Sequence, residues 1–177
     1  MKTILKNATV YTRKGFKKMD IAISGDRLLV PFDVSDNVQS DDIVFDFNHK
    51  YILPGFVDVH VHFREPGFSY KETIETGSKA AAHGGFTTVF TMPNLNLPPC
   101  DYASLKQQLD IIEKDAVIKV VPFGAITENQ KGRGMLSKMD EMADFVAGFS
   151  DDGVGVQADF TMEAAMVKVA SLGKIIS

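Results

Sequence analysis

Residues 56–62 have the sequence FVDVHVH, in which apolar residues alternate with one aspartate and two histidines. Successive side chains of a β-strand point to opposite faces, so this run predicts that Asp58, His60 and His62 share one face. A strand of a parallel sheet is usually buried on both faces, and buried imidazoles need partners. One metal ion would satisfy both histidines; the alternative is two core histidines bonded to nearby backbone. We favour the metal site.

Outward from this strand, apolar runs alternate with helix-like stretches. Strands are expected at 52–63, 86–92, 117–126, 145–150 and 174–177, and helices at 71–83, 102–114, 137–144 and 161–172. Such alternation is typical of a parallel sheet covered by helices, and both a barrel and an open doubly wound sheet fit it. A complete (β/α)8 barrel takes about 250 residues, so residues 51–177 would form about half of one. We therefore expect a truncated barrel.

The first fifty residues have a different pattern. Short strands are expected at 3–11, 20–23, 27–30 and 43–47, and no helix signal precedes residue 50. These residues predict a small β layer, so the expected division is a β domain at 1–50 followed by the barrel at 51–177.

Two polar residues follow expected strands, at the edge where an α/β barrel carries its active site. Arg64 could hold a carboxylate through two parallel hydrogen bonds, or it could pair with Glu65 at the surface. Asn94 could bind a ligand through its amide, or it could form a turn after Pro93.

A pair of acids, Asp151 and Asp152, ends the fourth apolar run. By strand parity Gly148, Ser150 and Asp152 share one face, and small residues suit a crowded barrel interior. Asp152 is therefore the expected inward carboxylate and candidate metal ligand, with a solvated turn as the alternative.

Composition excludes several classes of function. The 177 residues carry a formal net charge of −4, which gives no basic footprint for nucleic acid. No apolar run approaches the roughly 18 residues of a membrane helix, and the N-terminus does not resemble a signal peptide. With a single cysteine, Cys100, the chain is expected to be cytoplasmic. We interpret Cys100, His49 and His83 as incidental.

Five motifs together resemble the dihydroorotases of the amidohydrolase superfamily, in particular the bacterial class I type. They are HVHFREPG at 60–67, GGFTT at 84–88, MPN at 92–94, GAIT at 124–127 and SDDG at 150–153. Their order and spacing match along most of the chain. The resemblance implies a metal-dependent-hydrolase TIM-type barrel, of which this chain is expected to be the N-terminal portion.

The resemblance also implies a reaction, the reversible ring closure of N-carbamoyl-L-aspartate to dihydroorotate in pyrimidine biosynthesis. It implies that His60 and His62 bind zinc, that Asp152 bridges two zinc ions, and that Arg64 and Asn94 hold the substrate carboxylate with His62 close by. Further histidine ligands and the aspartate general base are expected beyond Ser177. No catalytic base is thus expected within the chain, and the chain alone should be poorly active.

Two alternatives stay open. Dihydropyrimidinases, hydantoinases and allantoinases share the His-X-His strand, but Arg64 and Asn94 favour a substrate that has a carboxylate. The chain could instead be a non-catalytic partner of aspartate transcarbamoylase, as some dihydroorotase-like proteins are. A homodimer is a further expected association, while nucleic acid and membrane are not expected partners.

Overall fold

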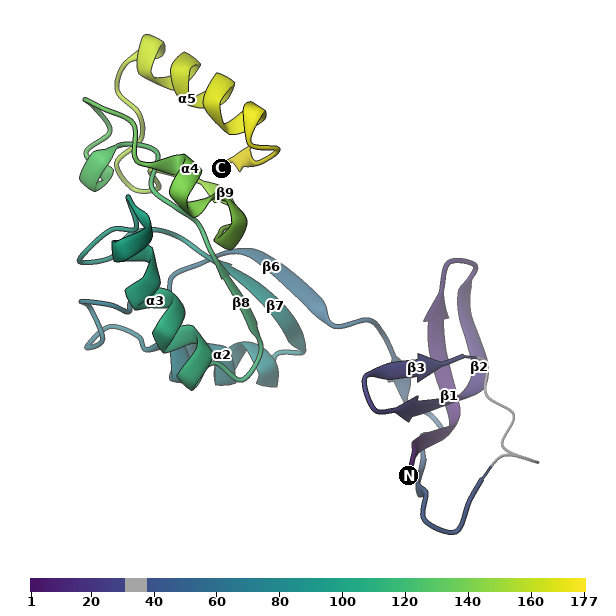
Figure 1. Ribbon diagram of the computed structural model, residues 1–177. Helices are drawn as coiled ribbons and strands as arrows, with labels where there is room; N and C mark the ends of the chain where they lie inside the picture. The colour runs from purple at the N-terminus through teal and green to yellow at the C-terminus, as the bar shows by residue number, and fades with distance from the viewer. Residues whose placement is uncertain (31–37) are drawn as a thin grey trace. The chain divides into compact units, whose positions relative to one another are not determined.

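A computed structural model describes residues 1–30 and 38–177 of the chain (Figure 1). The chain divides into two compact units, Met1–Pro54 and Gly55–Ser177. No helix in the described part of the chain is long and apolar enough to cross a membrane.

The first unit contains a five-stranded sheet. Its strands are β1 (Thr3–Thr12), β2 (Gly15–Ser24), β3 (Arg27–Leu29), β4 (Ile43–Asp46) and β5 (Tyr51–Ile52). The order is β3-β2-β1-β4, with β5 also paired to β1. β1 and β2 form an antiparallel hairpin, whereas β4 and β5 run parallel to β1. Ala8, Val10 and Ile21 form its small buried core.

β2 is longer than the strand expected at 20–23. It begins at Gly15, because Phe16 to Lys18 pair across the hairpin with Tyr11 to Thr9. The two lysines in this stretch are exposed and hide the strand from a search for apolar alternation.

The second unit is built on parallel strands that follow one another in sequence order (Figure 1). β6 (Phe56–Val61), β7 (Phe86–Thr91) and β8 (Lys119–Pro122) form one sheet, and β9 (Gly148–Phe149) pairs with β10 (Ile175–Ile176). A parallel bridge between Gly124 and Phe149 connects the chain just after β8 to β9. The parallel α/β arrangement is confirmed. Among the described residues β6 pairs only with β7 and β10 only with β9, so no barrel closes.

Helices separate these strands: α2 (Ile74–His83), α3 (Tyr102–Asp115), α4 (Met139–Met142) and α5 (Asp159–Ser171), with short 3-10 turns η1 (Glu128–Gln130) and η2 (Ala143–Phe145). α2 and α3 pack on the β6–β8 sheet in a core that includes Ile74, Val89 and Val120. A second core joins α3, α4 and α5 to β9 and includes Leu105, Phe149 and Ala165.

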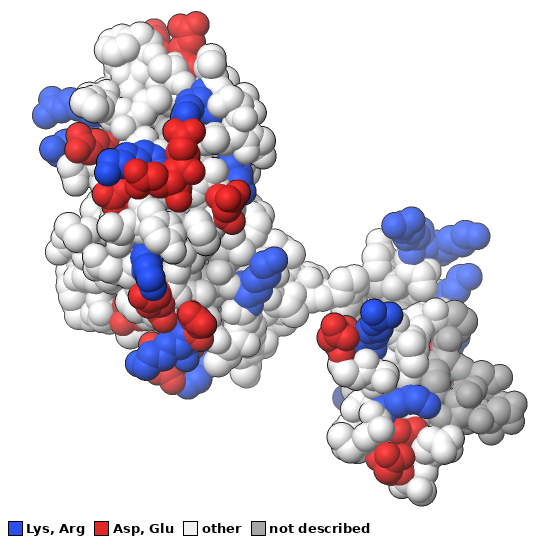
Figure 2. Space-filling model, in the orientation of Figure 1, with Lys and Arg blue, Asp and Glu red and all other residues white. Residues whose placement is uncertain are grey.

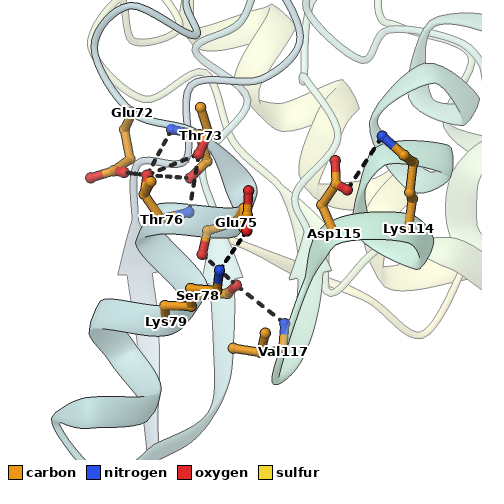
Figure 3. A network of polar contacts seen from close by, with 9 residues as sticks. All are labelled: Glu72, Thr73, Glu75, Thr76, Ser78, Lys79, Lys114, Asp115 and Val117. Carbon is orange, nitrogen blue, oxygen red and sulfur yellow. Dashed lines mark hydrogen bonds and ion pairs between the residues drawn. The ribbon is translucent and has the colours of Figure 1, made fainter.

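Local hydrogen bonds explain where the helices begin. Thr73 caps α2 in a reciprocal exchange with Thr76, so the helix begins at Ile74 rather than at Lys71 (Figure 3). The Ser78 hydroxyl of α2 accepts a hydrogen bond from the Val117 amide at 3.2 Å, which ties the helix to the segment before β8 (Figure 3). Asp101 caps α3 by accepting a hydrogen bond from the Ser104 amide, and the helix begins at Tyr102, as expected.

The expected helix at 137–144 is wrong in extent. Helix α4 has only four residues, followed by η2, and its N-cap is Lys138 without a side-chain cap. The hydroxyl of Ser137, the first residue of the expected helix, donates to the Ala125 main-chain carbonyl at 2.5 Å. The main-chain N–H of Ser137 donates to the main-chain carbonyl of Ile126, so Ser137 pairs with the segment that follows β8 and lies outside the helix.

Candidate metal centre

Three potential metal ligands converge at the carboxyl ends of strands β6 and β9. They are His60, His62 and Asp152, whose ligand atoms all lie within 4.8 Å of one another. His60 lies near the end of β6, His62 directly after it, and Asp152 in the loop after β9. Residues about 90 positions apart in sequence thus meet because parallel strands end at the same edge of a sheet.

The Asp152 carboxylate faces both histidines, one through each oxygen. Oδ1 lies 3.7 Å from Nε2 of His60, and Oδ2 lies 3.7 Å from Nε2 of His62. A zinc ion binds histidine nitrogen and carboxylate oxygen at about 2.0–2.2 Å, so two tetrahedral ligand atoms lie roughly 3.4 Å apart. The donor set and its spacing therefore fit a metal ion, with all three side chains partly accessible.

Asp58, which was expected on the same face as the histidines, is not a member of this group. Its carboxylate accepts a hydrogen bond from the His60 amide at 3.1 Å. The pairing of β6 with β7 changes register between Asp58 and Val61, so strict alternation ends there.

The environment of His62 favours the neutral form of its imidazole. Partial burial, followed by the positive charge of Arg64, lowers the pKa of its imidazole below the usual 6.5. Metals bind the neutral imidazole, so this lowered pKa favours the ligand form at neutral pH. Its Nδ1 is buried and has no hydrogen-bond partner in the described part of the protein.

Asp151, the neighbour of Asp152, has a different environment. It is 3% exposed, and its carboxylate accepts hydrogen bonds from the Ile126 amide at 2.8 Å and the Thr127 hydroxyl at 2.5 Å. The structure thus brings Asp152 to the histidines and uses Asp151 to join the β9 loop to the β8 loop.

Arg64 and Asn94 lie beside these ligands. Nη1 of Arg64 donates to the main-chain carbonyl of Asn94 at 3.5 Å. Nδ2 of the Asn94 side chain donates to the main-chain carbonyl of Asp152 at 2.5 Å. Glu65, the alternative partner of Arg64, instead accepts a hydrogen bond from the Ile74 amide at 2.8 Å. The amide oxygen of Asn94 is buried without a partner among the described residues.

One contact to the ligand loop has no counterpart in the sequence predictions. Nε2 of Gln130 donates to the Asp152 carbonyl at 2.9 Å. Gln130 lies in the glycine-rich stretch after β8, which has no metal-ligand or phosphate-binding spacing. No sequence signal could have identified this contact, because it depends on the path of the loop.

Charged groups elsewhere are mixed in sign. Acidic and basic side chains lie interspersed on the face of the second unit shown in Figure 2. Ion pairs within the second unit include Lys168 with Asp140 at 2.5 Å and Lys106 with Asp110 at 2.5 Å. No patch of one sign dominates that face.

The matching family model and the curated relatives agree on one family. The family model described as "Dihydro-orotase-like" matches residues 49–177. A dihydroorotase of Fusobacterium nucleatum is 47% identical over 174 residues, covering 98% of this chain and 40% of that protein. A dihydroorotase of Enterococcus faecalis is 44% identical over 97% of this chain and 40% of its own length. The chain thus spans about 40% of the length of these curated relatives.

Solved structures share the fold at low sequence identity. An L-hydantoinase (dihydropyrimidinase) from Arthrobacter aurescens matches with a TM-score of 0.81 and 20% identity, covering 98% of this chain and 39% of that one. A D-hydantoinase matches with a TM-score of 0.78, also at 20% identity, covering 99% of this chain and 39% of that one.

Proposed function

Because the chain belongs to the dihydro-orotase-like family, we propose that it supplies a zinc site and part of the substrate pocket of a dihydroorotase. The proposed reaction is the reversible conversion of dihydroorotate to N-carbamoyl-L-aspartate. The observation that carries this proposal is the convergence of His60, His62 and Asp152.

The proposed ligands are the two imidazoles and the Asp152 carboxylate, and two zinc ions are expected in a complete site. Zinc at this position would lower the pKa of a bound water to about 7 and polarise an amide carbonyl. His60 and His62 contribute neutral nitrogen ligands from one strand end. The Asp152 carboxylate, which has one oxygen 3.7 Å from each histidine nitrogen, would supply the third ligand.

The proposed role of Arg64 and Asn94, with His62 beside them, is to hold the substrate carboxylate. Arg64 uses one nitrogen on the Asn94 carbonyl and keeps further donors for an acid. A guanidinium binds a carboxylate through two parallel hydrogen bonds. The positive charge would also shield the incoming acid from the nearby Asp152.

The proposed architecture is half of a TIM-type (β/α) barrel at 51–177, preceded by part of a β-sandwich at 1–50. Consecutive parallel strands with intervening helices support it, as does the position of the candidate site at the strand ends. The boundary between compact units lies slightly later, after Pro54.

Zinc titration tests the site directly. The 177-residue chain should bind zinc measurably, and His60→Ala should weaken binding by more than about tenfold. His83→Ala removes an exposed histidine at the end of α2 and should leave binding unchanged. Equal affinity of His60→Ala and the unaltered chain would refute the proposed ligands.

Substrate competition tests the reaction. We propose that this chain alone turns over dihydroorotate slowly, because its three candidate ligands fall short of a two-zinc set. The residual activity should prefer dihydroorotate over hydantoin and allantoin, and Arg64→Gln should reduce that preference. A preference for hydantoin would favour the hydantoinase alternative. Turnover near that of a full-length relative would disprove the expected weakness.

Association and location remain predictions of the same proposal. We expect a cytoplasmic protein that forms a homodimer, and aspartate transcarbamoylase is the candidate protein partner. Analytical ultracentrifugation of the chain, with and without the transcarbamoylase, distinguishes a monomer, a homodimer and a mixed complex.

A further inference from the structure

The main-chain carbonyl of Asp152 accepts two side-chain hydrogen bonds. Nδ2 of Asn94 donates from the loop after β7 at 2.5 Å, and Nε2 of Gln130 donates from the loop after β8 at 2.9 Å. On the other side of the residue, the Asp152 amide donates to the Ser150 hydroxyl at 3.1 Å. The backbone of this candidate ligand is thus held at both of its peptide groups.

We propose that Gln130 is a positioning residue of the metal centre, which fixes the backbone of Asp152 so that its carboxylate faces both histidines. The proposal rests on the proposed metal site and adds a residue to it. With the flanking peptide planes fixed, the Asp152 carboxylate can move only by rotation of its own side chain. Outer partners that orient metal ligands in this way strengthen metal binding.

The loop that carries Gln130 is held against the ligand loop by independent contacts. The Thr127 hydroxyl donates a hydrogen bond to the Asp151 carboxylate and accepts one from the main-chain N–H of Gly132 at 2.8 Å. The main-chain N–H of Gln157 donates to the main-chain carbonyl of Gly132 at 2.7 Å, a contact that does not involve the Gln157 side chain. A Cβ atom at Gly132 would lie 2.1 Å from the Gly155 carbonyl oxygen, so only glycine permits this approach.

The backbone conformation of Gln130 also points to a specific role. Asn129 and Gln130 have φ values of 55° and 54°, in the left-handed region that residues other than glycine rarely adopt. Although Gln130 has a polar side chain, it is only 8% exposed. A buried amide needs a partner, and the Asp152 carbonyl is the acceptor that Gln130 reaches.

The test compares two glutamines that both donate to carbonyls of the ligand loop. Gln130→Met removes the donor to Asp152 and keeps side-chain length and neutrality. Gln157→Met removes an exposed donor to the Val154 and Gly155 carbonyls, at 2.9 and 3.0 Å, and serves as the matched control. In the full chain, Gln130→Met should weaken Co²⁺ and Zn²⁺ binding about tenfold. Gln157→Met should bind both ions as the unaltered chain does.

A second readout needs no metal. Amide hydrogen exchange of Asp152, resolved by NMR in the metal-free chain, should be faster in Gln130→Met and unchanged in Gln157→Met. Circular dichroism melting verifies that each variant folds. Unchanged exchange in Gln130→Met would overturn the proposal even if affinity fell, because Gln130 would then act by another route.

The two readouts separate failure of the site from failure of the positioning role. If the unaltered chain binds neither ion, the proposed zinc site is wrong, and the exchange rates alone decide whether Gln130 fixes Asp152. If the unaltered chain binds and Gln130→Met binds equally, the zinc site stands and the positioning role is overturned.

Discussion

Asp151 and Asp152 are adjacent in the chain, yet the first is buried against backbone donors and the second faces two histidines. Strand parity predicted which of the two would be inward, and alternation along FVDVHVH predicted that His60 and His62 would be neighbours. Asp58 does not join the group of possible ligands, and the strand pairing changes register between Asp58 and Val61. Gln130 could not be predicted, because its contact depends on two left-handed residues in a loop.

The two aspartates should respond differently to the same substitution. In Asp151→Asn the side-chain NH₂ group would face the N–H groups that now donate to the carboxylate, and buried donors would lose their acceptor. The substitution should lower the free energy of unfolding by about 2 kcal/mol or more. Asp152→Asn should change stability by less than about 0.5 kcal/mol and weaken zinc binding strongly. Urea denaturation of the metal-free chain and zinc titration measure the two effects. A destabilised Asp152→Asn with unimpaired zinc binding would contradict the assignment.

His62 should titrate below pH 6.5 in the metal-free chain, because burial and the charge of Arg64 disfavour its protonated form. At pH values between the His62 pKa of the folded state and 6.5, the unfolded state binds more protons than the folded state. The free energy of unfolding therefore decreases as the pH falls from 6.5 to the folded-state pKa. NMR titration of the imidazole measures the midpoint. Arg64→Gln removes one cause and should raise the midpoint; a midpoint above 6.5 in the unaltered chain would disprove the effect.

Among the elements, helices α2 and α3 and the parallel strands follow from the alternation of apolar runs and helix-like stretches, although α2 begins at Ile74 and not at Lys71. α3 begins after Asp101, as its sequence indicates. The segment at 137–144 resembles a capped helix equally well, but Ser137 bonds to the Ala125 carbonyl, a partner distant in sequence. The start of the 137–144 helix is therefore misplaced because Ser137 bonds to the segment that follows β8 and not to its own helix.

The cap of α3 gives a prediction at this scale. Asp101→Ala should cost about 1 kcal/mol, the usual loss for an N-cap aspartate. Hydrogen bonds from the Ser104 side chain and amide lower the pKa of Asp101, so the cap is intact above 3.8 and is lost as pH falls through the folded pKa. Asp110→Ala on the same helix breaks only an exposed pair with Lys106 and should cost less than about 0.5 kcal/mol. Thermal melts at pH 7 and pH 3 compare the variants; equal losses at both pH values for Asp101→Ala would exclude the cap.

For the whole molecule, alternation of strands and helices predicted a parallel sheet but left barrel and open sheet unresolved. Closure of a barrel requires strands that pair with the free edges of β6 and β10. Within the described residues no strand pairs with either edge. The outer strand β6 carries Val57 and Val59, which are 55% and 58% exposed. Exposed apolar strand edges are sites of association.

We therefore expect the chain to self-associate at micromolar concentration through β6. Val59→Lys places a charge on this strand and should shift the molecules toward monomer in multi-angle light scattering. Val167→Lys, at an exposed valine of α5, is the control. Loss of association in Val167→Lys alone would assign the contact to α5, and a monodisperse monomer of the unaltered chain would disprove self-association.

The convergence of His60, His62 and Asp152 also has a consequence for synthesis on the ribosome. Asp152 follows His62 by 90 residues, and at about 5–20 residues per second its codon is translated roughly 5–18 s later. During that interval the nascent chain presents a pair of imidazoles without the carboxylate that completes the group. If the proposed site binds a metal ion, an ion captured early would be held loosely and would exchange, and loading would be completed only after Asp152 has been added.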